Sequence, residues 1–343
     1  MSFYALGIDT SNYKTSIAVT DNNGEIIFER SVFLDIPLGE KGLRQSDAFF
    51  KHSNLLPCFI QELFNRFNPS DLSCIGVSSR PRNIEGSYMP CFLAGVNTGK
   101  QLGAILKIPV YEFSHQEGHA AAILEDNSFV QSNLNKCILF HLSGGTSEFL
   151  ICSRIPAGYD MSLVGGTKDI SIGQLIDRVG VALGLPFPAG KYLDEIAYID
   201  NDELLNLKEN NHLSLNLDIF FSDGYFNLSG IETKIMRLIQ NSDIDITERK
   251  FIITSMFDSI SKLIHKSTTY LSKQHDIKDV AIVGGVAASK YLRKKLTSVN
   301  NNNIVNIFFG SATLSSDNAV GIARLAQRLN RRTDETDNCL TIQ

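Results

Sequence analysis

The hydrophobic and polar positions of residues 1–113 predict strands first and then helices that alternate with strands. Apolar runs between small polar loops are typical of strands, whereas apolar residues three and four positions apart are typical of helices. The turn Asn22-Asn23-Gly24 marks a hairpin, and Pro57 predicts a kink or break in the helix that Ser46 caps. This order suits a mixed α/β lobe. The predicted strands are 4–11, 15–20, 25–33, 72–78 and 109–113, and the predicted helices are 46–64 and 93–106.

The second half of the chain opens on the same plan as the first. A strand at 137–142, a tight loop at 143–147 and a returning strand at 148–152 match the arrangement of residues 4–20, although the letters differ. We interpret the two units as a pseudo-repeat. Such hairpins are common in β structure, but their loops can also turn backbone N–H groups toward a phosphate. The later pattern predicts helices at 172–183, after 191, after 230 and at 247–272, with a polar surface excursion at 200–227.

A third glycine-containing turn lies near the end of the chain. A strand at 280–283 runs into Gly284-Gly285 and the start of a helix. A double glycine lets the backbone approach a flat or charged ligand, although it can also serve turn geometry alone. With the two hairpin units, this turn predicts an α/β, two-lobed actin-like, sugar-kinase or Hsp70-type ATPase (ASKHA) fold with a duplicated core. We expect lobes at 1–113 and 114–315, a terminal helix at 316–331 that returns to the first lobe, and a loose tail at 332–343.

Two histidines four residues apart mark a candidate metal site. An α-helix turns about 100° per residue, so His115 and His119 project from one face at a spacing that lets two imidazoles hold one metal ion. A histidine pair in a helix is also found half-buried with backbone partners. Two further residues favour a metal: His141 lies in an apolar strand just before a small-residue turn, and Asp317 stands at the start of a late helix.

The position of Glu117 argues against a metalloprotease. In an H-E-x-x-H motif the general base directly follows the first histidine. Glu117 comes two residues after His115, about 200° around the helix, and so it is turned away from the metal face.

The composition excludes several classes of protein. The chain has 343 residues, of which 43% are hydrophobic, so it can fill the cores of two lobes. A formal net charge of −5 argues against a protein built to coat nucleic acid and leaves room for a local basic face. The six cysteines form no C-x-x-C pair, and no segment reaches the ~20 apolar residues of a membrane span. We therefore expect a cytoplasmic protein with reduced cysteines and no membrane contact.

Short motifs along nearly the whole chain resemble those of the tRNA adenosine threonylcarbamoyltransferases, which were long filed as O-sialoglycoprotein endopeptidase-like proteins. Residues 7–11 are similar to the family's opening G-I-E-T-S, and residues 115–119 to its H-x-E-G-H. The ordered set is specific, although each piece is short. The other matches are Ser143-Gly144-Gly145 to S-G-G, 173–177 to G-E-A-F-D, Leu228-Ser229-Gly230 to F-S-G, 284–288 to G-G-V-A-A and 316–319 to T-D-N-A.

This resemblance implies transfer of a threonylcarbamoyl group from threonylcarbamoyl-AMP to N6 of an adenosine beside the tRNA anticodon. It implies that His115, His119 and Asp317 hold one divalent metal ion, iron or zinc, and His141 is a fourth candidate. The expected substrate is an adenine nucleotide or threonylcarbamoyl-AMP. The expected partner is tRNA, together with helper proteins of the pathway. A dimer with a related subunit is one expected assembly. The candidate substrate- and nucleotide-binding residues are Asp9, Ser11, Ser143, Gly144, Gly145, Thr146, Asp177, Gly190, Asp194, Gly284, Gly285 and Ser289.

Several residues depart from the family pattern. Tyr13-Lys14 stands where the family has Asp-Glu, and Arg80-Pro81-Arg82 stands where it has G-P-G. Gln174 replaces a Glu, Ser289 replaces an Asn, and Thr146-Ser147 replaces H-T. Three alternatives therefore stay open: transfer to the tRNA adenosine, transfer of a carbamoyl group to a different acceptor, and a catalytically silent paralogue that binds nucleotide and metal as a scaffold.

Overall fold

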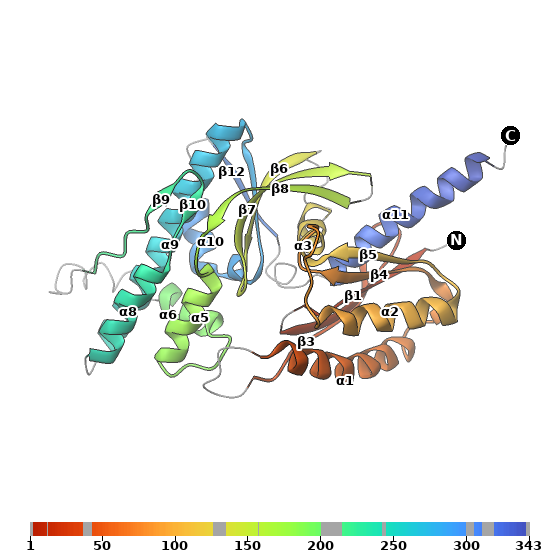
Figure 1. The fold of residues 1–343 in the computed structure, drawn as a ribbon, viewed down its shortest axis with the longest axis horizontal. Helices are drawn as coiled ribbons and strands as arrows, with labels where there is room; N and C mark the ends of the chain where they lie inside the picture. The colour runs from red at the N-terminus through yellow and green to blue at the C-terminus, as the bar shows by residue number, and fades with distance from the viewer. Residues whose placement is uncertain are drawn as a thin grey trace.

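Two β-sheets form the two lobes of the protein, and two helices lie between them (Figure 1). The computed structural model describes residues 3–11, 13–36, 43–125, 135–156, 158–199, 215–241, 245–299, 305–310 and 319–340.

The first sheet has the strand order β3-β2-β1-β4-β5. Its first three strands form an antiparallel meander, whereas β1, β4 and β5 run parallel to one another. Parallel neighbours need a crossover connection, and the helix α2 (Phe92–Leu106) supplies it between β4 and β5. The strands are β1 (Tyr4–Asp9), β2 (Lys14–Thr20), β3 (Ile26–Phe33), β4 (Leu72–Arg80) and β5 (Val110–Ser114).

The second sheet repeats this arrangement. The strands β6, β7 and β8 form the antiparallel meander, and β6, β11 and β12 run parallel. The order β8-β7-β6-β11-β12 thus corresponds strand by strand to the first sheet, which confirms the predicted duplicated core. Two short strands extend the sheet beyond β8. The strands are β6 (Lys136–Leu142), β7 (Ser147–Ile155), β8 (Gly158–Thr167), β9 (Phe221–Ser222), β10 (Tyr225–Phe226), β11 (Asp279–Val283) and β12 (Asn306–Phe309).

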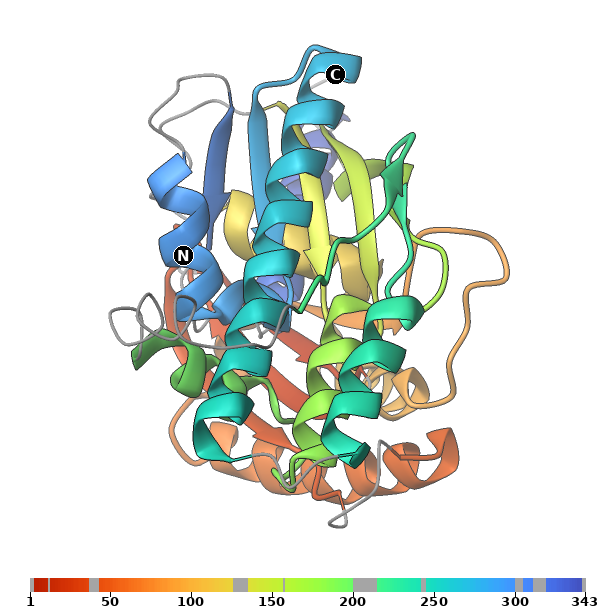
Figure 2. The same ribbon diagram turned by 90° about the vertical axis from the view of Figure 1, so that its left-hand side faces the viewer.

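Helices cover the outer face of each sheet. Figure 2 shows the long helix α9 running along the second sheet, where its apolar residues share a core cluster with Phe140 and Ile282 of the strands. Within the described ranges, none of the helices has a stretch long and apolar enough to cross a bilayer. Besides α2, the helices are α1 (Gln45–Phe64), α3 (His115–Leu124), α5 (Ile172–Ala182), α6 (Gly190–Ile199), α8 (Ser229–Asn241), α9 (Ile246–His275), α10 (Lys290–Val299) and α11 (Ala319–Leu340), with short 3₁₀ turns η1 (Pro69–Asp71) and η2 (Gly285–Ala288).

The helices α3 and α11 form the core between the lobes. Strand side chains alternate between faces, so Ile138 and Leu142 of β6 face the outer cluster, whereas Cys137 and Leu139 face α3 and α11. At Gly321 of α11 an added Cβ would lie only 1.9 Å from the carbonyl oxygen of Gly118 on α3. Two backbones can approach this closely only at glycine. The crossing therefore fixes α3, which carries His115 and His119.

The helix α1 begins earlier than the predicted cap allows, and it is not broken at the proline that was singled out. It begins at Gln45 with Arg44 at the N-cap position, so Ser46 lies inside the first turn, and it passes through Pro57 without a break. A proline removes one backbone hydrogen bond from a helix interior. Here Leu56, Phe59 and Leu63 are buried on the same face, and this packing holds the helix together across the proline.

Two further differences concern the second lobe and the C-terminal segment. The strand patterns predicted neither β8 nor β12, because β8 carries many half-exposed positions and β12 is short. The helix α11 runs to Leu340 and covers most of the segment 332–343, for which the sequence predicted a loose tail. No glycine or proline follows Gly321 before that point to end the helix.

Candidate functional site

Three histidine side chains converge between the lobes. His115 and His119 lie one turn apart on α3, and their ring centroids are 4.7 Å apart. The ring centroid of His141 lies 4.7 Å from that of His119 and 6.3 Å from that of His115. His141 reaches them because it shares the inward face of β6 with Cys137 and Leu139. Helical spacing and strand alternation thus bring together the three imidazoles that the sequence predicted as metal ligands.

Burial keeps two of these rings neutral. Burial and the charge of His115 lower the pKa of His119 well below its ordinary value. Burial, again with the charge of His115, lowers the pKa of His141 to about 3. Within the described part of the chain, Nδ1 of His119 and both ring nitrogens of His141 have no hydrogen-bond partner. Neutral imidazole nitrogens without partners are in the form that binds a metal ion.

Asp9 contacts the ring of the third histidine, His115. Its two carboxylate oxygens are 3.2 and 3.3 Å from Nδ1 of His115, and Ser11 Oγ donates a hydrogen bond to it at 2.9 Å. Burial by itself raises the pKa of Asp9, but the charge and hydrogen bond of His115 outweigh that effect and lower the pKa to about 2. We predicted Asp9 and Ser11 as nucleotide-binding residues. In this structure Asp9 contacts His115, because strand alternation turns it toward α3, and the hydroxyl of Ser11 contacts Asp9.

The described residues supply some of the features of a metal site but not a full set of ligands. His115 uses Nδ1 for Asp9, and metal-ligating histidines commonly bind a carboxylate in this way with the nitrogen that does not face the metal. Among the described residues, however, no group of three or more His, Cys, Asp or Glu side chains is placed to hold a metal ion. The predicted ligand Asp317 lies at 311–318, outside the described residues. The described residues by themselves therefore do not form a complete metal site.

The side chain of Glu117 caps the N-terminus of α3. Its Oε2 accepts hydrogen bonds from the N–H and the hydroxyl of Ser114, at 2.9 and 2.8 Å, while Ser114 Oγ accepts from the N–H of Glu117 at 3.2 Å. This reciprocal capping box satisfies two backbone donors of the helix start. The carboxylate of Glu117 is therefore not the base of an H-E-x-x-H site.

The side chain of Ser143 holds the loop after β6 in a tight turn. Ser143 Oγ accepts hydrogen bonds from the backbone N–H groups of Gly145, at 3.4 Å, and Thr146, at 3.0 Å. The carbonyl oxygen of Gly144 accepts a hydrogen bond from Ser171 Oγ at 2.9 Å. The predicted phosphate loop is thus a tight turn. A ligand could use the N–H groups of Gly145 and Thr146 only by displacing Ser143 Oγ.

A pocket of ≈ 120 Å³ lies beside this loop and between the lobes. Asp177 lines it and accepts a hydrogen bond from the N–H of Ala189 at 2.8 Å. Burial raises the pKa of Asp177 to about 6, against the opposing effect of the N–H groups of Ala189 and Gly190. Of the predicted nucleoside-binding residues, Asp177 therefore lines the pocket and Gly190 supports it from behind. The lining residues are Tyr13, Gly144, Gly145, Gln174, Asp177, Arg178, Val181 and Phe187.

Replacing Asp177 by Asn is expected to stabilise the protein above pH 6. The folded-state pKa is about 6 and the ordinary value is 3.8, so the cost of the buried charge is absent below pH 3.8, grows between these values and is complete above pH 6. Asn keeps the acceptor for Ala189 but carries no charge. We expect a gain on the order of 2 kcal/mol at pH 7.5 and little at pH 4, measured by urea unfolding. An equal effect at both pH values would contradict this assignment.

Asp194 and Ser289 join α6 to α10. Asp194 accepts hydrogen bonds from the N–H groups of Lys290 at 2.8 Å and Tyr291 at 3.1 Å, and also from the hydroxyl of Ser289. Ser289 Oγ in turn accepts from the N–H of Leu292 at 3.1 Å. We predicted both residues to contact the nucleoside. In this structure they cap α10, since a carboxylate at a helix N-terminus satisfies the unpaired N–H groups there.

The two late glycines have different surroundings. Gly284 has a φ of +93°, and a Cβ on it would lie 2.3 Å from the carbonyl oxygen of Leu142. Gly284 is therefore required by the close approach of its turn to β6. A Cβ on Gly285 would meet none of the described residues within 4 Å.

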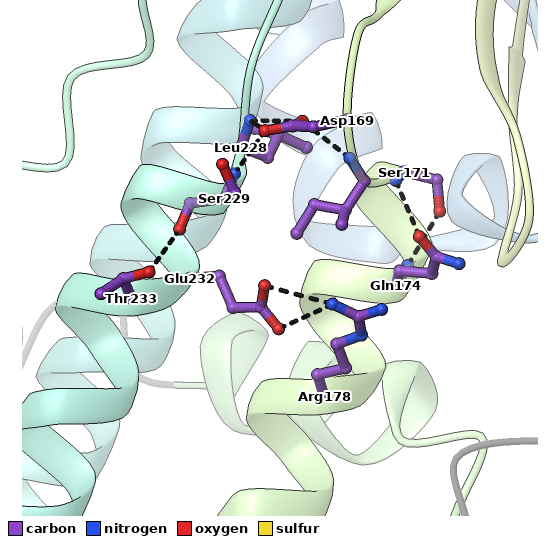
Figure 3. A network of polar contacts seen from close by, with 9 residues as sticks. Asp169, Ser171, Gln174, Arg178, Leu228, Ser229, Glu232 and Thr233 are labelled. Carbon is purple, nitrogen blue, oxygen red and sulfur yellow. Dashed lines mark hydrogen bonds and ion pairs between the residues drawn. The ribbon is translucent and has the colours of Figure 1, made fainter.

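A polar network holds α8 in place behind the pocket (Figure 3). Asp169 accepts hydrogen bonds from the backbone N–H groups of Ile170 at 2.7 Å, Leu228 at 2.9 Å and Ser229 at 2.9 Å. Burial alone raises the pKa of Asp169, but these bonds outweigh that effect and lower the pKa below its ordinary value. Leu228 and Ser229 belong to the motif that resembles F-S-G. In this chain, the motif connects α8 to the segment before α5.

Besides the predicted Asp177, the face of α5 that lines the pocket carries three residues that were not predicted as site residues. Gln174, Asp177, Arg178 and Val181 line the pocket together, and positions three, four and seven apart share one face of a helix. That spacing could have identified them. Arg178 also donates to both carboxylate oxygens of Glu232 on α8, at 3.0 and 3.2 Å. No sequence pattern indicated this partner.

Comparison with known proteins identifies the family and the fold. The sequence model of the family described as tRNA N6-adenosine threonylcarbamoyltransferase matches residues 41–324. A protein of that name from Thermotoga neapolitana is 24% identical over 329 residues, which cover 95% of this chain and 94% of the relative. Another from Prosthecochloris aestuarii is 27% identical over 347 residues, covering 97% of this chain and 96% of the relative.

A solved structure shows the same fold. Component A of the (R)-2-hydroxyglutaryl-CoA dehydratase of Acidaminococcus fermentans has a TM-score of 0.52 and 16% sequence identity, over 96% of this chain and 99% of that chain. At this identity the likeness concerns the fold alone, which is of the ASKHA type as predicted. Because the family model covers most of its length, the chain belongs to the tRNA N6-adenosine threonylcarbamoyltransferase family, a family of transferases.

Proposed function

We propose that this protein transfers a threonylcarbamoyl group from threonylcarbamoyl-AMP to N6 of an adenosine beside the tRNA anticodon. The observation that carries the proposal is the cluster of three imidazoles in a member of this family. A buried polar group without a partner costs about 1–3 kcal/mol, and its retention favours a ligand. His141 also lies only two residues before Ser143, and the loop that begins there lines the interlobe pocket through Gly144 and Gly145.

In the proposed reaction, the N6 amine attacks the carbonyl carbon of the carbamoyl group. A new C–N bond forms, the bond from that carbon to the phosphate oxygen breaks, and AMP leaves with the electron pair while N6 loses a proton. The N–H groups of Gly145 and Thr146, once released from Ser143 Oγ, would donate to the phosphate or acyl oxygen. Asp177 has an acceptor oxygen in the pocket for a hydroxyl of the nucleoside.

His115, His119 and Asp317, with His141 as a fourth candidate, would hold one divalent metal ion, iron or zinc. Such an ion supplies a Lewis acid that neutralises developing negative charge beside the substrate. Asp9 would fix the ring of His115 so that its Nε2 is the ligating atom.

Replacing Asp9 by Asn is expected to weaken metal binding about 10- to 100-fold, because the ring of His115 loses the carboxylate that orients it. The measurement is metal content after equilibration with a competing chelator. Ser11→Ala is the matched control, since it removes a neighbour of Asp9 but keeps the contact between Asp9 and His115. Unchanged metal affinity in Asp9→Asn would argue that His115 is not a ligand.

The proposed acceptor is tRNA, and we propose a cytoplasmic protein that works with helper proteins for synthesis of the adenylate. A related subunit is the proposed partner for a dimer. The test supplies purified protein with threonylcarbamoyl-AMP and unmodified tRNA and detects the modified nucleoside by mass spectrometry. Formation of the nucleoside in the presence of added iron or zinc, and its loss with a chelator, supports the proposal. A carbamoylated product on another added acceptor would instead support an altered substrate.

A second candidate function is that of a nucleotide-binding scaffold. The contacts of Arg82, which differs from the family pattern, favour it. Arg82 of the first lobe forms a 2.7 Å ion pair with Glu148 of the second lobe, which also accepts a hydrogen bond from Gln116 at 3.0 Å. The residue that replaces a family glycine therefore joins the lobes. Nucleotide binding without any transfer in the test above would support the scaffold.

A further inference from the structure

Two aromatic rings meet across the lobes at the edge of the pocket. Tyr13 lies in the turn between β1 and β2 of the first lobe, and Phe187 lies between α5 and α6 of the second. Their ring centroids are 5.5 Å apart with an interplanar angle of 88°, which is an edge-to-face contact. This geometry is attractive because the positive edge of one ring meets the negative face of the other. The contact is therefore an interlobe attraction at the pocket itself.

Each ring is fixed to its own lobe. The carbonyl oxygen of Tyr13 accepts a hydrogen bond from the N–H of Leu34 at 2.7 Å. On the other side, the chain before Phe187 is tied to α5 where the N–H of Leu185 donates to the carbonyl oxygen of Gly180 at 2.9 Å. The chain after it is tied to Asp177 through Ala189. With these bonds intact, the two rings separate when the lobes move apart.

The pocket in this closed arrangement is too small for a whole nucleotide. Its volume is ≈ 120 Å³, whereas sites for small molecules usually enclose about 300–1,000 Å³. A nucleotide must therefore enter a more open arrangement, in which the wall formed by Tyr13 and Phe187 has parted.

We propose that the contact between Tyr13 and Phe187 is a latch, which must open to admit and release an adenine nucleotide between the lobes. The inference rests on the proposed nucleotide site. The Asp that the family pattern has at this place carries no ring, so the latch is a property of Tyr13 in this chain. It predicts slower association and lower affinity for the nucleotide, because the contact must be broken in the complex, where the pocket has to be larger.

The test measures association and dissociation of a fluorescent adenine nucleotide, mant-ADP, by stopped flow. Tyr13→Ala removes the ring and is expected to raise the association rate constant about fivefold and to lower the Kd by about the same factor, with little change in the dissociation rate constant. Tyr13→Phe keeps the ring and should resemble the wild type, as should Tyr88→Ala, which removes an exposed tyrosine outside the pocket. If Tyr13 only contacted the ligand, Tyr13→Ala would instead raise the Kd and the dissociation rate constant.

A second variant tests the latch without removing it. The chain contains no tryptophan, so Tyr13→Trp places a single reporter at the contact. Its emission is expected to change at the rate of nucleotide entry, and an unchanged emission overturns the latch. Binding with unaltered rates in Tyr13→Ala also overturns the latch and leaves the proposed function standing. If neither the wild type nor any variant binds the nucleotide, both the nucleotide site and the latch are wrong.

Discussion

Replacing His119 by alanine is expected to lower threonylcarbamoyl transfer at least about 100-fold and to remove the bound metal. His119 is the central ring of the cluster, since its centroid lies 4.7 Å from those of both His115 and His141. Its side chain is 4% exposed and Nδ1 has no partner among the described residues, so the ring contributes little hydrogen-bonding energy to the fold. The measurements are transfer rate and metal content, with thermal unfolding to establish that the variant folds.

The matched control is His265→Ala, because His265 is an exposed residue of α9 outside the pocket and the cluster. It should keep both transfer and metal. A folded His119→Ala variant with undiminished transfer would remove the histidine cluster from the proposed chemistry.

Replacing Gly321 by alanine is expected to reduce the free energy of unfolding by about 2–4 kcal/mol. A Cβ at this position would lie 1.9 Å from the carbonyl oxygen of Gly118 and 2.7 Å from the N–H nitrogen of Ala122. The backbone of α3 must then move away from α11. Since Gly118 directly precedes His119, the shift should also reduce metal content. Denaturant unfolding and metal analysis measure the two effects.

Gly230→Ala is the control for this prediction. Gly230 is also a helical glycine, but a Cβ on it would meet nothing within 4 Å. Alanine favours helix over glycine by up to about 1 kcal/mol, so this variant should be as stable as the wild type or more so. If Gly321→Ala proved equally stable, the close crossing of α3 and α11 would be wrong.

The repeated core could be predicted from the sequence because its signals are local. Apolar runs and hairpin turns predicted the first meander and the strands β6 and β7 of the second, and this repetition predicted the duplication that the strand orders show. The histidine cluster was equally accessible. His115 and His119 share a helix face by their spacing, and His141 points to them through the alternation of β6.

The roles of several polar residues could not be predicted, because they depend on distant partners. Asp194 lies 96 positions from the N–H of Lys290 that it caps, and Asp9 lies 106 positions from His115. A family motif can place such residues near a site without saying whether they face the ligand or support another side chain. The break predicted at Pro57 does not occur for a related reason: burial of Leu56 and Phe59 outweighs the local cost of a proline inside the helix.

The most direct test of the central proposal is the content of N6-threonylcarbamoyladenosine in the tRNA of cells depleted of their own transferase. Expression of this protein is expected to restore the modified nucleoside, whereas expression of His119→Ala at the same level should not. If the wild-type protein is present and metal-loaded but the tRNA stays unmodified, the proposed transfer to tRNA is contradicted.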